Sequence, residues 1–140
     1  MKRALSLTAV GCLLAGLAGC VRQTTDRAHR PVERHALLVL YQKGAGGCVA
    51  RTVEKLNAYV NDTVVWQILN ECDSPKLVEI DFAGGRSPVS WIDGPSLTVN
   101  PGAEKRLSGR VNTGTVGSYN YVPKINGTPG ADPRLDVDPY

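Results

Sequence analysis

The chain is poor in the side chains that carry most acid–base and metal chemistry. Its 140 residues include two histidines, one methionine and one phenylalanine, and aromatic residues make up 6% of the total. Because histidine is the usual general base near neutral pH and a common metal ligand, both roles have few candidates. A content of 42% apolar and 21% charged residues, with 9 prolines, excludes a disordered or collagen-like chain. The length allows one domain of ordinary size.

Catalytic motifs are also missing beyond residue 35. The serines there have no histidine partner for a nucleophilic triad, and the glycine-rich stretch 43–47 lacks the Gly-Lys-Ser/Thr end of a phosphate-binding loop. Glu79 and Asp81 alternate with apolar residues, and we interpret them as solvated outward residues rather than as a carboxylate pair for glycoside hydrolysis. The sequence therefore predicts that the protein is not an enzyme.

The charge distribution does not favour nucleic-acid binding. The net charge of +3 arises in the first 35 residues, because residues 36–140 contain ten basic and eleven acidic side chains. A nucleic-acid partner requires a concentrated basic surface, so none is expected. Residues 21–35 are polar and include four arginines, and they are typical of a flexible tether.

The first twenty residues have the pattern of a targeting signal. A basic start, Met1-Lys2-Arg3, precedes an apolar run over 4–18 that is too short to cross a bilayer as a helix and has the proportions of a secretory signal peptide. The run ends in Leu17-Ala18-Gly19-Cys20, which resembles the lipobox of bacterial lipoproteins. The alternative is an ordinary signal peptide cleaved nearby, with Cys20 as a spare thiol.

The lipobox resemblance implies where the protein is located. Residues 1–19 are then removed, and Cys20 becomes the acylated first residue of the mature chain. Each buried acyl CH₂ contributes about 0.8 kcal/mol, so several chains, palmitate among them, hold the protein at the membrane. Val21 stands where an Asp marks inner-membrane retention in such lipoproteins, which favours the periplasmic leaflet of the outer membrane.

The predicted processing of the first twenty residues decides which cysteines remain free to form a disulfide. Cys12 leaves with the signal peptide and Cys20 is acylated, which leaves Cys48 and Cys72 in the folded part. Two thiols in an oxidising compartment have one intramolecular pairing, so we predict a Cys48–Cys72 disulfide. A loop of this length stabilises the fold by roughly 3 kcal/mol in the chain-entropy model.

The remaining chain, residues 36–140, has the pattern of an all-β domain. Short runs rich in Val, Ile, Thr and Tyr are separated by turn residues, and no segment sustains a helical repeat. The run 36–41 is continuously apolar, which predicts a strand buried on both faces. The stretch 49–59 is ambiguous and could contain one helical turn within 52–58. The expected strands are 36–41, 63–69, 77–82, 97–99, 103–111, 117–122 and 134–137. About seven short strands indicate an antiparallel β-sandwich.

The order of these segments resembles that of bacterial cupredoxin-like domains. Three features carry the resemblance: the strand Asn61-Asp62-Thr63-Val64-Val65-Trp66, the turn Pro101-Gly102, and the strand Gly117-Ser118-Tyr119-Asn120-Tyr121, followed by Asp132-Pro133 and the segment 135–137. The resemblance covers most of residues 48–138. It implies a Greek-key β-sandwich over 36–140.

The copper ligands of cupredoxins are missing from the matching positions. A type 1 site uses two imidazoles and a thiolate, usually with a weak axial Met. Val122 stands where the thiolate is expected, residues 122–139 contain no Cys, His or Met, and residues 70–82 contain no His. We therefore expect no metal and no cofactor. Cys48 and Cys72 resemble instead the disulfide of copper-free members of this group.

Two candidate contact residues and two candidate functions remain. Trp91 and Ile92 lie between turns rich in Pro and Gly, where they could bind a partner, although Trp91 could instead pack against the edge of the sandwich. The first function is a membrane-anchored, non-catalytic binding or structural module that faces an envelope protein, a polymer or a small ligand. The alternative is a periplasmic copper-handling protein with a non-standard site that uses His29 and His35.

Overall fold

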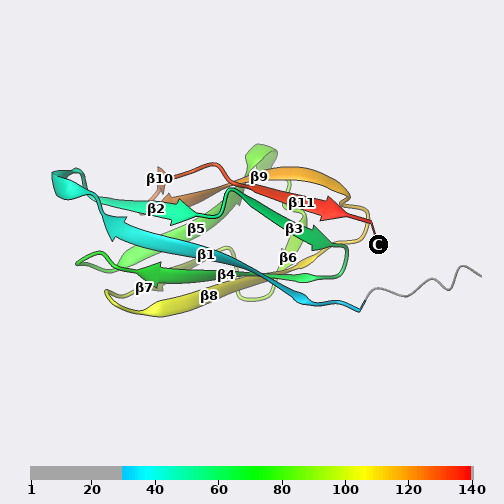
Figure 1. Cartoon of the computed structure of the whole chain (residues 1–140), viewed down its shortest axis with the longest axis horizontal. Helices are drawn as coiled ribbons and strands as arrows, with labels where there is room; N and C mark the ends of the chain where they lie inside the picture. The colour runs from blue at the N-terminus through cyan, green and yellow to red at the C-terminus, as the bar shows by residue number, and fades with distance from the viewer. Residues whose placement is uncertain (1–29, 140) are drawn as a thin grey trace, which may run out of the picture.

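The structure is a computed structural model that describes residues 30–139, shown in Figure 1. Within these residues the chain forms strands and two single-turn 3₁₀ segments, and no helix is long and apolar enough to cross a membrane. The elements are β1 (Glu33–Gln42), η1 (Gly44–Gly46), β2 (Cys48–Thr52), β3 (Lys55–Tyr59), β4 (Thr63–Asn70), β5 (Lys76–Phe82), η2 (Ala83–Gly85), β6 (Val89–Trp91), β7 (Ser96–Val99), β8 (Glu104–Val111), β9 (Gly117–Ile125), β10 (Thr128–Pro129) and β11 (Arg134–Asp138).

The strands form two stacked sheets, which confirms the predicted all-β sandwich. One sheet has the order β2-β1-β4-β8-β6, and the other has the order β3-β11-β9-β5-β7, with β10 paired to β9. The sheets are mixed, and not antiparallel throughout as the sequence predicts, because β1 pairs with β4 in parallel and β11 pairs with β3 in parallel. The chain leaves the first sheet after β2 and forms β3 at the edge of the second before it returns as β4. Parallel neighbours cannot be joined by a tight hairpin and need such a crossover.

Strict alternation of side chains places one apolar set between the sheets. In β4 the fully buried apolar residues are Val64, Trp66 and Ile68. The same alternation buries the inward apolar residues of β5 and β11, as the sequence predicts; they are Val78, Ile80, Phe82, Leu135 and Val137. Trp66 is central, because its ring lies 5.8 Å from that of Tyr121 and 5.1 Å from that of Trp91, measured between centroids.

The segment 49–59, which the sequence left ambiguous, contains no helical turn. β2 ends at Thr52 and β3 begins at Lys55, so both halves of this segment are extended. The partner strands decide the outcome, because β2 pairs with β1 and β3 pairs with β11. Non-local pairing overrides a weak local helical preference. The short edge strand β6 also forms, between the two turns that flank Trp91, where no strand was expected.

A buried carboxylate fixes the entry of the chain into the sandwich. The Asp62 side chain is fully buried and accepts hydrogen bonds from the backbone N–H groups of Val32 and Tyr59, both at 3.0 Å. Arg34 donates its Nε–H to the same carboxylate at 2.8 Å. Because of these contacts, β1 begins at Glu33, three residues before the expected start at Ala36.

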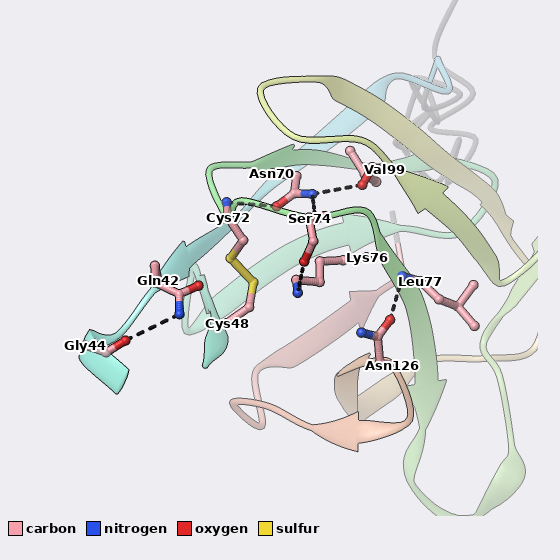
Figure 2. Close-up of a disulfide and its surroundings, with 10 residues drawn as sticks. All are labelled: Gln42, Gly44, Cys48, Asn70, Cys72, Ser74, Lys76, Leu77, Val99 and Asn126. Carbon is pink, nitrogen blue, oxygen red and sulfur yellow. Dashed lines mark hydrogen bonds between the residues drawn. A yellow bond between two sulfur atoms is a disulfide. The ribbon is translucent and has the colours of Figure 1, made fainter. Parts of the chain in front are cut away.

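A buried amide performs a similar role at the opposite end of β4. Asn70 is fully buried, and its Nδ2 donates hydrogen bonds to the carbonyl oxygens of Ser74 at 3.0 Å and Val99 at 2.8 Å. Its Oδ1 accepts a hydrogen bond from the Cys72 N–H at 2.9 Å. Every polar atom of this side chain is therefore paired, and the loop that carries Cys72 is held against the end of β7 (Figure 2).

Candidate interaction surface

The outer surface of the β1-containing sheet is unexpectedly apolar. Along β1 the residues Ala36, Leu38 and Leu40 face the core and are fully buried. The alternate residues face outward, and Leu37 keeps 48% and Tyr41 keeps 36% of its surface exposed. The expectation that this run is buried on both faces is therefore wrong. No further layer within the described residues covers the outer side at these positions, although Val65, which faces the same side of β4, is buried.

We call this surface the β1 face and define it by the outward residues of four adjacent strands. They are Leu37, Val39 and Tyr41 of β1, Val49 and Arg51 of β2, Gln67 and Leu69 of β4, and Glu104 and Arg106 of β8. At its β2 side the face contains an open groove of about 860 Å³. Groove residues beyond this set are Thr52, Val53, Glu54 and Glu71.

The register of the strands arranges the residues of the β1 face in rows. Val39 pairs with Arg51 on one side and with Leu69 on the other, and Leu69 pairs with Glu104. One row therefore reads basic, apolar, apolar, acidic from β2 to β8. Both charged side chains are exposed, and both apolar side chains are half-buried. The row has a positive and a negative end separated by two aliphatic residues.

The outer surface of the other sheet is mostly polar, with Leu77 as its exposed apolar side chain, and it contains ion pairs. Lys55 Nζ lies 2.6 Å from Asp136 Oδ2, and Lys124 Nζ lies 2.7 Å from Asp81 Oδ2. The hydrogen bond from Lys55 holds the pKa of Asp136 below its usual value, with smaller contributions from the Ser118 hydroxyl and other nearby charges. The hydrogen bond to Asp81 raises the pKa of Lys124. The two outer surfaces of the sandwich therefore differ in their content of apolar and ion-paired side chains. The interpretation of Asp81 as an outward polar residue is confirmed.

The predicted disulfide is present. Cys48 and Cys72 are bonded, with their Cα atoms 6.0 Å apart. Cys48 begins β2 and Cys72 follows β4, so the bond joins the loop after β4 to the edge strand of the same sheet (Figure 2). Cys72 is buried and belongs to the core cluster. Both sulfurs are oxidised, so neither is available as a thiolate ligand.

Trp91 and Ile92 have different environments. The Trp91 ring packs on Trp66 and lies 6.3 Å from the ring of Phe82, measured between centroids, so its aromatic surface contributes to the core. Ile92 is 58% exposed and lies next to β8, where its N–H bonds to the Ser108 carbonyl oxygen. Of this pair, Ile92 has the exposed side chain, and contact of either residue with a partner stays a prediction.

The structure brings no metal ligands together within residues 30–139. No group of three or more His, Cys, Asp or Glu side chains occurs there. His35 is half-exposed, with its Nε2 at 3.3 Å from Glu33 Oε2. Val122 pairs with Asp81 and lies on the outer polar surface, whereas its neighbour Pro123 faces inward. Neither residue has a side-chain donor atom for copper.

Three buried polar groups meet in the core near β2. The Tyr121 hydroxyl, the Trp66 indole N–H and the Thr52 hydroxyl each lack a hydrogen bond of ordinary geometry to any described residue. Burial raises the pKa of Tyr121, and the nearby Trp66 and Thr52 groups offset part of this effect. Alternation predicts the inward position of Tyr121, but contact between side chains from three strands requires the tertiary structure.

Several sequence predictions lie outside the described residues. They are the signal peptide over 1–19, the acylation of Cys20, the significance of Val21 and the copper role of His29. These remain predictions.

Comparison with known proteins gives a structural similarity alone. No known protein family matches the sequence, and no curated protein matches it. One similar solved structure is a multicopper oxidase from Campylobacter jejuni, described as a metallo-oxidase, which has a cupredoxin-like fold. The TM-score is 0.48 and the identity is 12%, over 81% of this chain and 27% of the oxidase. The present chain thus spans about a quarter of that protein, and the activity named there belongs to the oxidase.

Proposed function

We propose that the protein is a membrane-anchored periplasmic lipoprotein whose β-sandwich acts as a non-catalytic binding or structural module of the cell envelope. The observation that carries the binding role is the apolar β1 face, with Leu37 and Tyr41 at 48% and 36% exposure. A contiguous exposed apolar patch on a soluble domain indicates an interaction site, whereas scattered single apolar residues do not. The polar, ion-paired surface of the opposite sheet makes the β1 face the side that binds.

The anchoring role is supported by the lipobox-like sequence at Cys20 and by the disulfide. A bond between Cys48 and Cys72 suits an oxidising compartment such as the bacterial periplasm. Between Cys20 and β1 lie twelve residues, which reach about 40 Å when fully extended. This length gives the domain room to stand clear of a lipid surface.

The non-catalytic role is supported by the chemistry of the described residues. His35 is the one histidine among residues 30–139, and it lies at the surface beside Glu33. The Asp136 carboxylate, whose pKa is lowered, is held by Lys55 in an ion pair on an open sheet surface. An acid–base site instead places such a group in a concave pocket with a second functional group.

Metabolic labelling with a radioactive fatty acid tests the anchor. The wild-type chain and a Cys12→Ser variant are expected to incorporate label and to sediment with membranes. A Cys20→Ser variant is expected to lose both properties. Equal labelling of the Cys20→Ser variant, or no labelling of the wild type, would contradict the proposal.

Copper titration tests the competing copper-handling role. The purified protein is expected to bind no stoichiometric Cu(I) or Cu(II), as measured by elemental analysis after dialysis. Stoichiometric uptake that disappears when His29 and His35 are both replaced by alanine would overturn the cofactor-free role.

A further inference from the structure

The β1 face has the properties of a surface that pairs with a copy of itself. We propose that the partner of this face is a second copy of the same chain, packed sheet against sheet around a two-fold axis that runs along the strands between β1 and β4. The proposal rests on the proposed function, since it names the partner of the binding surface assigned there.

The charge pattern of one row carries the argument. The row Arg51–Val39–Leu69–Glu104 is fixed by the strand register. A two-fold axis parallel to the strands, between β1 and β4, places β2 of one copy over β8 of the other. Arg51 then faces Glu104 of the second copy, and Val39 faces Leu69. By symmetry each contact occurs twice, so the row is complementary to itself.

The neighbouring row adds a further attraction between opposite charges. Leu37 pairs with Gln67, and Gln67 pairs with Arg106. Under the same axis, Arg106 of one copy lies over the β2 side of the other, where Glu54 lines the groove. The acidic and basic side chains of the face are thus mixed rather than of a single sign. A mixed surface disfavours an anionic bilayer or a nucleic acid, both of which attract uniformly basic surfaces.

The dimensions of the face fit a weak dimer. Four strands about 4.8 Å apart, each contributing about seven residues at about 3.3 Å per residue, project roughly 450 Å² per copy. Two copies bury about twice that area, which lies near the lower limit of about 1,000 Å² for specific interfaces. Sheets stack face to face at about 10 Å when aliphatic side chains interdigitate, and Val39, Leu69 and Leu37 supply such side chains.

Charge reversal in the full chain tests this arrangement. Two forms of the chain with different C-terminal tags are expressed together, extracted in detergent and captured through one tag, and association is also measured by sedimentation velocity. Arg51→Glu and Glu104→Arg each oppose like charges twice per dimer, so each is expected to weaken self-association at least about tenfold. The double variant Arg51→Glu/Glu104→Arg restores opposite charges and is expected to recover most of the association.

The control reversal is Glu79→Arg, which changes a charge on the polar surface of the other sheet and is expected to have no effect. Thermal unfolding of every variant separates lost association from lost folding. A wild-type chain that stays monomeric would overturn the proposal, and so would failure of the double variant to recover. Arg51-dependent capture of a different protein would overturn the second copy as the partner. Fatty-acid labelling of the same samples reports separately on the anchor, so the two proposals can fail independently.

Discussion

Removal of the Asp62 carboxylate is expected to destabilise the domain strongly. The side chain is fully buried and binds the N–H groups of Val32 and Tyr59 and the guanidinium of Arg34. An Asp62→Ala change leaves two backbone donors and the Arg34 guanidinium, whose side chain is 33% exposed, without their acceptor. Breaking a buried ion pair costs about 3–5 kcal/mol, and we expect about 4 kcal/mol here. For a domain of this size, this lowers the Tm by about 15–20 °C.

Equilibrium urea unfolding, followed by tryptophan fluorescence, measures this loss. Asp62→Asn is the sharper variant, because it keeps the shape but turns one acceptor into a donor that faces other donors. We expect it to lose nearly as much stability as Asp62→Ala. Asp73→Ala, at an exposed position, is the matched control and is expected to change stability by less than about 0.5 kcal/mol. A loss below about 1 kcal/mol for Asp62→Ala would refute the assigned role of this carboxylate.

Three further predictions concern other features. Replacing Cys48 and Cys72 together by alanine opens a loop with a sequence separation of 24, so calorimetry should show a loss of about 3.5 kcal/mol; an unchanged Tm would contradict the chain-entropy account. Tyr121→Phe removes a hydroxyl that lacks an ordinary hydrogen bond and should change stability by less than about 1 kcal/mol in urea unfolding, whereas a loss above about 2 kcal/mol would reveal a bridged network. The pKa of Asp136 is lowered on folding, chiefly by Lys55, so its stabilisation is present above the ordinary carboxyl pKa and is lost as the pH falls through the lowered value; the Tm difference between wild type and Asp136→Asn should therefore shrink between about pH 5 and pH 2, and a constant difference would argue against the ion pair.

Local alternation was sufficient to predict most of the core. The residues Val78, Ile80 and Phe82 alternate with Glu79 and Asp81, and this period of two assigns each residue to a face before any partner strand is known. The disulfide followed from the count of cysteines that remain once the predicted signal peptide and the predicted acylation of Cys20 are set aside. Both inferences use information that lies within a short window or in the composition.

The β1 face could not be predicted in the same way. An unbroken apolar run such as Ala36 to Tyr41 occurs in a strand covered on both sides and also in a strand with one uncovered apolar side. The difference depends on whether another layer exists, which no short window records. The parallel pairing of β1 with β4 is likewise set by the crossover through β3. The rows that join Arg51 to Glu104 become visible only once that register is known.

The position of the chain ends has a consequence for how the domain is presented. In Figure 1, β1 begins at the same end of the elongated sandwich at which β11 ends, whereas β2 begins and β4 ends at the far end. The disulfide therefore lies at that far end, because Cys48 begins β2 and Cys72 follows β4. A lipid at residue 20 would hold the end where β1 begins nearest the bilayer, with the strands directed along the membrane normal. Leu37 and its neighbours would then point sideways along the leaflet. Copies that diffuse in one plane meet at a much higher effective concentration than copies in free solution, so even a weak lateral contact would become populated.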